Sequence, residues 1–347
     1  MTTGWPGAVA VAKKVAGSYP LGESYHLAHV ARSLPPIVAR CNDLVAEETG
    51  LELPGVPEVA VVGRVQWVER NLGAFTHLLE PAIRRIEERL DEVGLRGRAA
   101  NLAARRFIGL EMGALLGVLS RRVLGQYELV LPTGGEADSM AFVGGNIIEL
   151  ERSHQFIPSA FRTWIALHEC AHRAQFVGVS WMRDHFRSLV EELLSGAQPE
   201  HGRWTRLAGE IKRAVQEGRP MIDESGLLGL LAGPKQRAAL DKVQALMSLL
   251  EGHGHVVMDR IGERIVAGQS RMTAALKARR ADPRLATFYR LVGIELKVRQ
   301  YEMGAAFVTA VERRAGWAAL TQAWIGPETL PTLTEIEEPE SWLARVA

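Results

Sequence analysis

The sequence has few cysteines, no long hydrophobic run and almost no net charge, and each absence excludes a class of protein. Two cysteines in 347 residues, Cys41 and Cys170, are too few for a disulfide scaffold and are typical of a reducing compartment. No stretch reaches the roughly 18 apolar residues that span a bilayer. A formal net charge of +1 provides no electrostatic attraction for nucleic acid or an anionic membrane.

The N-terminus also lacks the pattern of a secretion signal. Its short apolar run Ala8–Ala12 is followed by Lys13 and Lys14, whereas a signal peptide has its basic residues first. We therefore expect a cytoplasmic protein with no membrane or nucleic-acid partner. The remaining composition, 47% apolar and 23% charged residues, is that of an ordinary globular protein with a substantial core.

Helical periodicity dominates what is present. Apolar residues recur at helical spacing along most of the chain, and a sheet signal is confined to Tyr127–Leu131 and Ala141–Leu150. The tail after Pro327 reads as an extended segment with a short final turn. The predicted fold class is mainly α, with a small β-sheet of two or more short strands. We expect one α-rich domain over residues 1–347, with a subdivision at 1–125 and 126–347 as the alternative.

The most informative run is His168-Glu169-Cys170-Ala171-His172, which has the form HExxH. Residues four apart lie on one face of a helix, so both imidazoles can reach one ion, and the glutamate can act on a water beside it. Pro158 indicates the start of this helix and Gly178 its end. Cys170 points away from the ligand face and is expected to pack as a small apolar residue. A predicted strand beside such a helix would suit an extended substrate that binds by strand addition.

A third ligand has to come from elsewhere in the chain. A metzincin would continue the motif as HxxGxxH, but the equivalent positions here are Gln175 and Gly178, which excludes that class. The best candidate segment is Leu249–Asp259, because its polar side chains lie in a strongly apolar helical setting and need partners there. We prefer Glu251 as the ligand.

Two alternatives for the third ligand stay open. His255 could bind the metal with Asp259, four residues later, orienting its ring, or His253 could bind it. The structural alternative is a helix N-terminal turn with exposed histidines, because Gly252 and Gly254 weaken a helix. A further catalytic candidate is Tyr301, whose phenol could stabilise an oxyanion; with Lys297 it could equally form an ordinary charged helix face.

Several segments of the sequence together resemble the sequence pattern of one known family. They are Trp67-Val68 with Asn71, Leu119–Tyr127, His168–Phe176, Leu250–His253 with Val257–Asp259, Arg299–Gly304 and Gly326–Pro331. From about residue 60 to Trp342 the chain resembles a bacterial family of zinc-dependent hydrolases. Some members of that family are labelled as associated with biosynthesis of a deazaflavin cofactor. The resemblance implies a zincin-like helical protein whose motif maps onto His168, Glu169 and His172. It favours Glu251 as the third ligand and supplies no substrate.

We therefore expect a zinc-dependent hydrolase, a gluzincin-type metallopeptidase or amidase acting on a peptide or a small amide. Zinc would be held by His168, His172 and Glu251, and Glu169 would take the proton of the attacking water. The rival hypothesis is a zincin-like protein without catalysis that serves binding or assembly, with no metal or a closed structural site. Neither the substrate nor the oligomeric state follows from the sequence.

Overall fold

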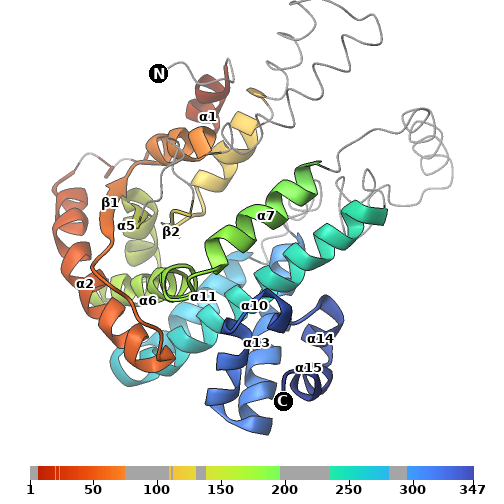
Figure 1. Cartoon of the computed structure of the whole chain (residues 1–347). Coiled ribbons are helices and arrows are strands. Elements are labelled where there is room, and N and C mark those ends of the chain that lie inside the picture. Colours follow the sequence, from red (N-terminus) through yellow and green to blue (C-terminus); the bar gives the residue numbers. More distant parts are fainter. Residues whose placement is uncertain are drawn as a thin grey trace, which may run out of the picture. The chain divides into compact units, whose positions relative to one another are not determined.

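The structure is a computed structural model that describes residues 7–19, 21–22, 24–74, 109–110, 112–129, 138–195, 234–280 and 295–347 (Figure 1). Within these ranges, the side chains of residues 194–195, 234–236, 279–280 and 295–301 are outside the description. The chain divides into two compact units, Met1–Ser180 with Val257–Met272, and Trp181–Val256 with Thr273–Ala347. Mainly helical structure with one small mixed sheet confirms the predicted fold class.

The first unit contains the sheet and the motif helix. Its helices with defined bounds are α1 (Ala8–Ala16), α2 (Tyr25–Thr49), α5 (Gly144–Ser153) and α6 (Pro158–Val177). Residues 64–74 and 112–120 are helical as well. A core cluster joins α1, β1, β3 and these two helical stretches around Trp67, Leu72 and Leu116.

The sheet has the strand order β1-β3-β2, with β1 (Glu58–Val62), β3 (Ser139–Val143) and β2 (Gly125–Tyr127). Strand β1 runs parallel to β3 in the register Ala60 to Ala141. Strand β2 runs antiparallel to β3, with Gln126 opposite Ala141. Because β2 is an edge strand, the backbone groups that face away from β3 are available to other elements.

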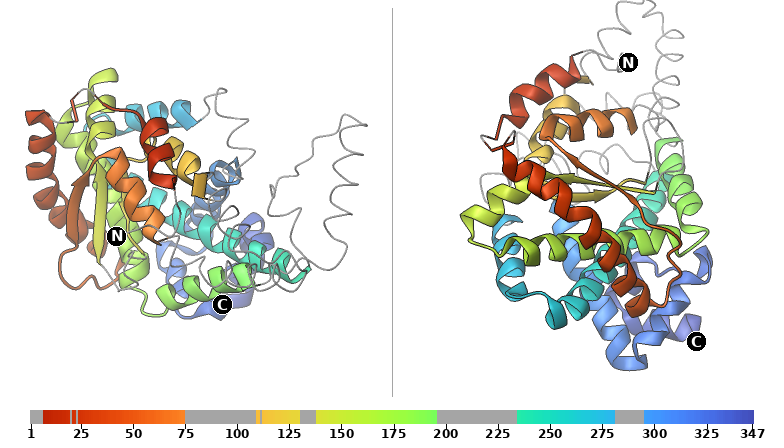
Figure 2. Two further views of the ribbon diagram at one scale, coloured as in Figure 1. Left: turned by 90° about the horizontal axis from the view of Figure 1, so that it is seen from above. Right: turned by 90° about the vertical axis from the view of Figure 1, so that its left-hand side faces the viewer.

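Helix α6 begins and ends where the sequence predicts. Pro158 occupies its first turn, and the backbone N–H of Gly178 donates to Ala174 O at its end. The helix packs along α2, as the two views of Figure 2 show. Buried Arg173 fastens α6 to its surroundings, since its guanidinium donates to Asp138 just before β3 and to Asn42 on α2.

Two predictions about the sheet are wrong. Residues from Gly144 onward form α5 and not a strand, because the buried Asn146 side chain donates to the carbonyls of Ser120 and Val123 and so fixes a helical turn there. Strand β1 lies outside the region to which the sheet signal was assigned. The strand predicted at Tyr127–Leu131 corresponds to β2, which ends at Tyr127, and residues 130–131 lie outside the described residues.

The second unit is helical. It contains α7 (Met182–Ser195), most of α10 (Pro234–Ile265) and of α11 (Gln269–Arg280), α13 (Glu295–Ala315), η1 (Trp317–Trp324), η2 (Pro327–Thr329), α14 (Leu333–Glu337) and α15 (Pro339–Val346). The predicted extended tail is therefore wrong. Thr332 and Glu335 form a capping box that starts α14. Trp342 on α15 is fully buried against Phe307 of α13, so apolar packing folds the tail back into helices.

Helix α10 is continuous through Gly252, so the alternative of a helix N-terminal turn at Gly252 and Gly254 is wrong. The reason is a close crossing with α13. A Cβ on Gly252 would overlap the backbone carbonyl of Gly304, and a Cβ on Gly304 would overlap the carbonyl of Ser248. Glycine is thus required here by the approach of two backbones. None of the described helices combines the length and the apolar composition needed to cross a bilayer.

Candidate metal centre

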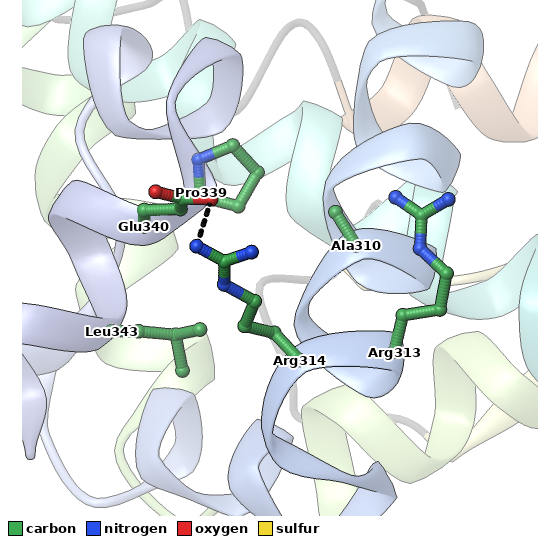
Figure 3. Close-up of a pocket in the computed structure, with 6 residues that line it drawn as sticks. All are labelled: Ala310, Arg313, Arg314, Pro339, Glu340 and Leu343. Atoms are coloured by element: carbon green, nitrogen blue, oxygen red, sulfur yellow. Dashed lines mark ion pairs between the residues drawn. The ribbon is translucent and has the colours of Figure 1, made fainter.

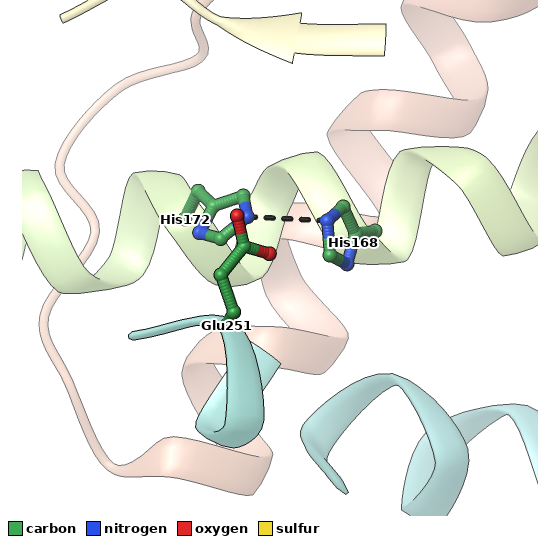
Figure 4. Close-up of side chains that lie close together, drawn as sticks. All are labelled: His168, His172 and Glu251. Carbon is green, nitrogen blue, oxygen red and sulfur yellow. Dashed lines mark hydrogen bonds between the residues drawn. The ribbon is translucent and has the colours of Figure 1, made fainter. Parts of the chain in front are cut away.

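The two histidines of the motif converge on one point. They lie one helical turn apart on α6, and their Nε2 atoms are 3.1 Å from each other (Figure 4). The ring planes meet at 81°. Two nitrogens that bind one zinc at about 2.0–2.1 Å with tetrahedral angles lie about 3.3 Å apart. The observed separation therefore fits two imidazoles that share one ion.

Glu251, on α10, completes the only cluster of this kind among the residues that the structure describes. One ligand atom each from His168, His172 and Glu251 all lie within 4.8 Å of one another, and Figure 4 shows the carboxylate directed at the two rings. Glu251 is 5% exposed. Two imidazoles and one carboxylate are a donor set that zinc accepts, and three protein ligands leave a position open for water. The residues present therefore fit the ion.

The other candidates of the same segment have different surroundings. His253 is 1% exposed, stacks on Trp317 with 5.7 Å between ring centroids, and meets Trp324 edge-on at 5.1 Å. His255 is half-buried. Asp259 accepts a 2.6 Å hydrogen bond from Nε2 of Gln269. None of these three belongs to the cluster around the motif histidines.

Glu169 is anchored to the edge strand of the sheet. Its side chain is 4% exposed, and its Oε2 accepts the backbone N–H of Tyr127 at 2.9 Å. That N–H faces away from β3, because alternate residues of an antiparallel pair bond to the partner strand, and next to Tyr127 it is Glu128 whose N–H donates to Ser139 O. A Cβ on Gly125 would lie 2.7 Å from both Cγ and Oε1 of Glu169. Strand β2 thus holds the carboxylate of the motif from two sides.

This contact bears on strand addition, which the sequence suggested for the strand beside the motif helix. An added strand would need the outward N–H of Tyr127, but that group already donates to Glu169. A substrate that paired with β2 at this residue would have to displace the carboxylate. At Tyr127 the outward N–H of β2 therefore holds Glu169, and strand addition along the rest of β2 stays a prediction.

Replacing Gly125 by alanine is expected to displace the Glu169 carboxylate from Tyr127 N–H, because the new Cβ takes its place. A hydrogen bond to a charged group contributes about 1.5–3 kcal/mol. The amide of Tyr127 should then exchange its proton roughly 10–100-fold faster, as measured by hydrogen–deuterium exchange. Gly63→Ala is the control, since its Cβ meets only Gln66 Oε1, at 3.8 Å. Unchanged protection of Tyr127 in Gly125→Ala would contradict the contact.

Sequence reasoning missed the partner of His172. Nδ1 of His172 lies 3.0 Å from Oε1 of Gln175. The signal for this contact was present, since residues three apart on a helix are neighbours. Cys170 packs as expected: its thiol donates to Val38 O, and burial, with Cys41 and Glu169 nearby, raises its pKa well above the ordinary value. Its hydrogen bond to α2 and its absence from the cluster of His168, His172 and Glu251 agree with a packing role.

Two other features concern α13. The side chains of Tyr301 and Lys297 on α13 lie outside the described residues, so the oxyanion role of Tyr301 stays a prediction. A pocket of about 340 Å³ opens between α13 and α15 (Figure 3). Arg314 pairs there with Glu340 at 2.5 Å, but both side chains are mostly exposed. An exposed pair of this kind contributes little to binding or stability.

A helical protein with HExxH on a buried helix is of the zincin class, and the comparisons with known proteins identify the family. The sequence matches the family of zincin-like metallopeptidases over residues 4–343. It is 30% identical to a protein whose crystal structure is described as that of a "putative hydrolase with a novel fold" from Chloroflexus aurantiacus. That match covers 98% of this chain and 97% of the other, with a TM-score of 0.71. No curated protein matches the sequence significantly. The chain belongs to the zincin-like metallopeptidase family.

Proposed function

We propose that this protein is a zinc-dependent hydrolase that cleaves a peptide or a small amide. His168, His172 and Glu251 would hold the zinc ion. The observation that carries the proposal is the convergence of their ligand atoms within 4.8 Å. Membership of a metallopeptidase family supports the same reaction class.

A zinc ion held here would supply a Lewis acid that acidifies water and polarises a carbonyl group. Glu169 would act as the general base, take a proton from the attacking water and pass it to the leaving nitrogen. Its hydrogen bond from Tyr127 N–H, at 2.9 Å, fixes the direction of the carboxylate. The burial of Glu169 keeps bulk water from competing for that carboxylate.

The test is a zinc measurement on the full-length protein. We expect wild type to bind one zinc ion per chain, measured by competition with a chromogenic chelator, and to hydrolyse members of a quenched-fluorescent peptide library. Removing the metal with a chelator should abolish hydrolysis, and added zinc should restore it. His172→Ala and Glu251→Gln should each lose the stoichiometric zinc, because two ligands cannot complete the site.

His154→Ala is the matched control, since this histidine caps α5, stacks on Phe156 and does not belong to the cluster. It should bind zinc like wild type. Equal zinc affinity in His172→Ala and wild type would refute the metal centre. Full zinc binding with no open coordination position, seen by X-ray absorption spectroscopy, would instead refute hydrolysis and favour a structural site.

A further inference from the structure

Gln175 is buried on α6, one turn after His172. Its exposed fraction is 0%, and its side-chain oxygen lies 3.0 Å from Nδ1 of His172. An amide oxygen can only accept a hydrogen bond. The proton of the imidazole therefore lies on Nδ1 and is donated to Gln175.

This proton position decides what the other ring nitrogen can do. With the proton on Nδ1, Nε2 of His172 carries a lone pair, and it points to the place where Nε2 of His168 lies 3.1 Å away. In known metal sites a ligating histidine almost always donates its second N–H to an oxygen acceptor, and loss of that acceptor weakens metal binding about 10–100-fold. Gln175 occupies the position of such an acceptor.

The alternative explanation is that the Gln175 side chain only packs in the core and has no role toward His172. Its neighbours Ala174 and Phe176 are buried too, and an apolar side chain would fill the same space without the cost of burying an amide. An amide at a fully buried position, with its oxygen directed at a motif histidine, is better explained by the need of the imidazole than by packing.

We propose that Gln175 is a positioning residue of the metal centre, which fixes the tautomer and the ring orientation of His172 so that Nε2 faces the ion. This inference rests on the proposed zinc site. It makes Gln175 necessary for metal affinity although its side chain acts only through His172.

The experiment compares zinc affinities of full-length variants by chelator competition. Gln175→Leu removes the acceptor and should weaken zinc binding about 10–100-fold. Gln175→Asn keeps an amide that is one methylene too short and should weaken binding similarly. Gln175→Glu restores an oxygen acceptor and should bind zinc within about threefold of wild type or more tightly. Gln269→Leu is the control, because this buried glutamine bonds Asp259 and not a motif histidine.

Circular dichroism establishes that each variant is folded, and ¹⁵N spectra of histidine-labelled protein report whether Nδ1 of His172 carries the proton. If Gln175→Leu does not fold, the difference in zinc affinity between Gln175→Asn and Gln175→Glu tests the role of Gln175 instead. Wild-type zinc affinity in Gln175→Leu or Gln175→Asn would overturn the inference, as would a glutamate variant as weak as the asparagine one. In those cases the loss of zinc in His172→Ala would leave the proposed function standing. Unchanged affinity in His172→Ala would overturn both.

Discussion

Glu169→Gln should lose hydrolysis by about 10²–10⁴-fold while it keeps its zinc, because the amide cannot take a proton from water. The substitution preserves shape, and the glutamine oxygen can still accept the backbone N–H of Tyr127. Zinc content should stay at one ion per chain, since Glu169 is not among the converging ligands. The measurement is the turnover rate on a substrate of the wild-type protein, with zinc titrated in parallel.

Glu149→Gln is the matched control, because Glu149 pairs with Arg64 on the surface of α5 and lies outside the motif. It should turn over like wild type. A Glu169→Gln protein that kept full activity would show that another group takes the proton. One that lost zinc together with activity would show that Glu169 helps to hold the metal, which would change its role from base to ligand.

The helix that carries the motif could be predicted because its signals are local. Pro158 and Gly178 mark its ends, and the spacing of His168 and His172 places both rings on one face. Glu251 was preferred for a physical reason of the same kind, since a carboxylate within an apolar helical stretch needs a partner. The structure brings it within 4.8 Å of both histidines, although its role as a ligand stays a prediction.

The groups that hold the motif could not be predicted, because the sequence does not show which backbone groups face it. Tyr127 contributes its N–H to Glu169, and any residue but proline would offer the same group. Gly125 is small because it lies against a carboxylate 44 residues further along the chain. Gln175 is the exception, because it lies three residues after His172 and residues at that spacing are neighbours on a helix.

The two wrong predictions about the sheet also come from contacts that the sequence does not show. The run Gly144–Leu150 contains Ile147 and Ile148, which favour strands, yet the buried side chain of Asn146 and its two carbonyl partners select a helix. Strand β1 pairs in parallel with β3, about 80 residues later in the sequence. Such pairing leaves no local turn signal. Tertiary contacts thus outweigh the local strand preference at Gly144–Leu150. In β1, the strand forms by pairing with a distant segment that the local sequence does not indicate.

The crossing of α10 and α13 gives the second large effect, in Gly252→Ala. The added Cβ would overlap the backbone carbonyl of Gly304, so the helices must move apart. Overpacking of this kind lowers the free energy of unfolding by about 1–3 kcal/mol, and by more where backbone has to shift. The higher helix propensity of alanine raises it by about 1 kcal/mol. We expect a net loss of about 2 kcal/mol and a fall of the melting temperature by about 3 °C, measured by calorimetry.

Gly262→Ala, on the same helix, is the contrast, because the nearest atoms to its Cβ belong to the side-chain amide of Gln269 and not to a backbone. That amide must shift and strain its 2.6 Å hydrogen bond to Asp259 Oδ1, a loss of about 1 kcal/mol that a gain in helix propensity of about 1 kcal/mol offsets. Its melting temperature should stay within about 1 °C of wild type. Since Glu251 directly precedes Gly252 on α10, the displaced helix in Gly252→Ala should also weaken zinc binding, whereas Gly262→Ala should not. A Gly252→Ala protein that melted higher than wild type would show that the backbones do not meet there, and the place assigned to the Glu251 carboxylate would lose its support.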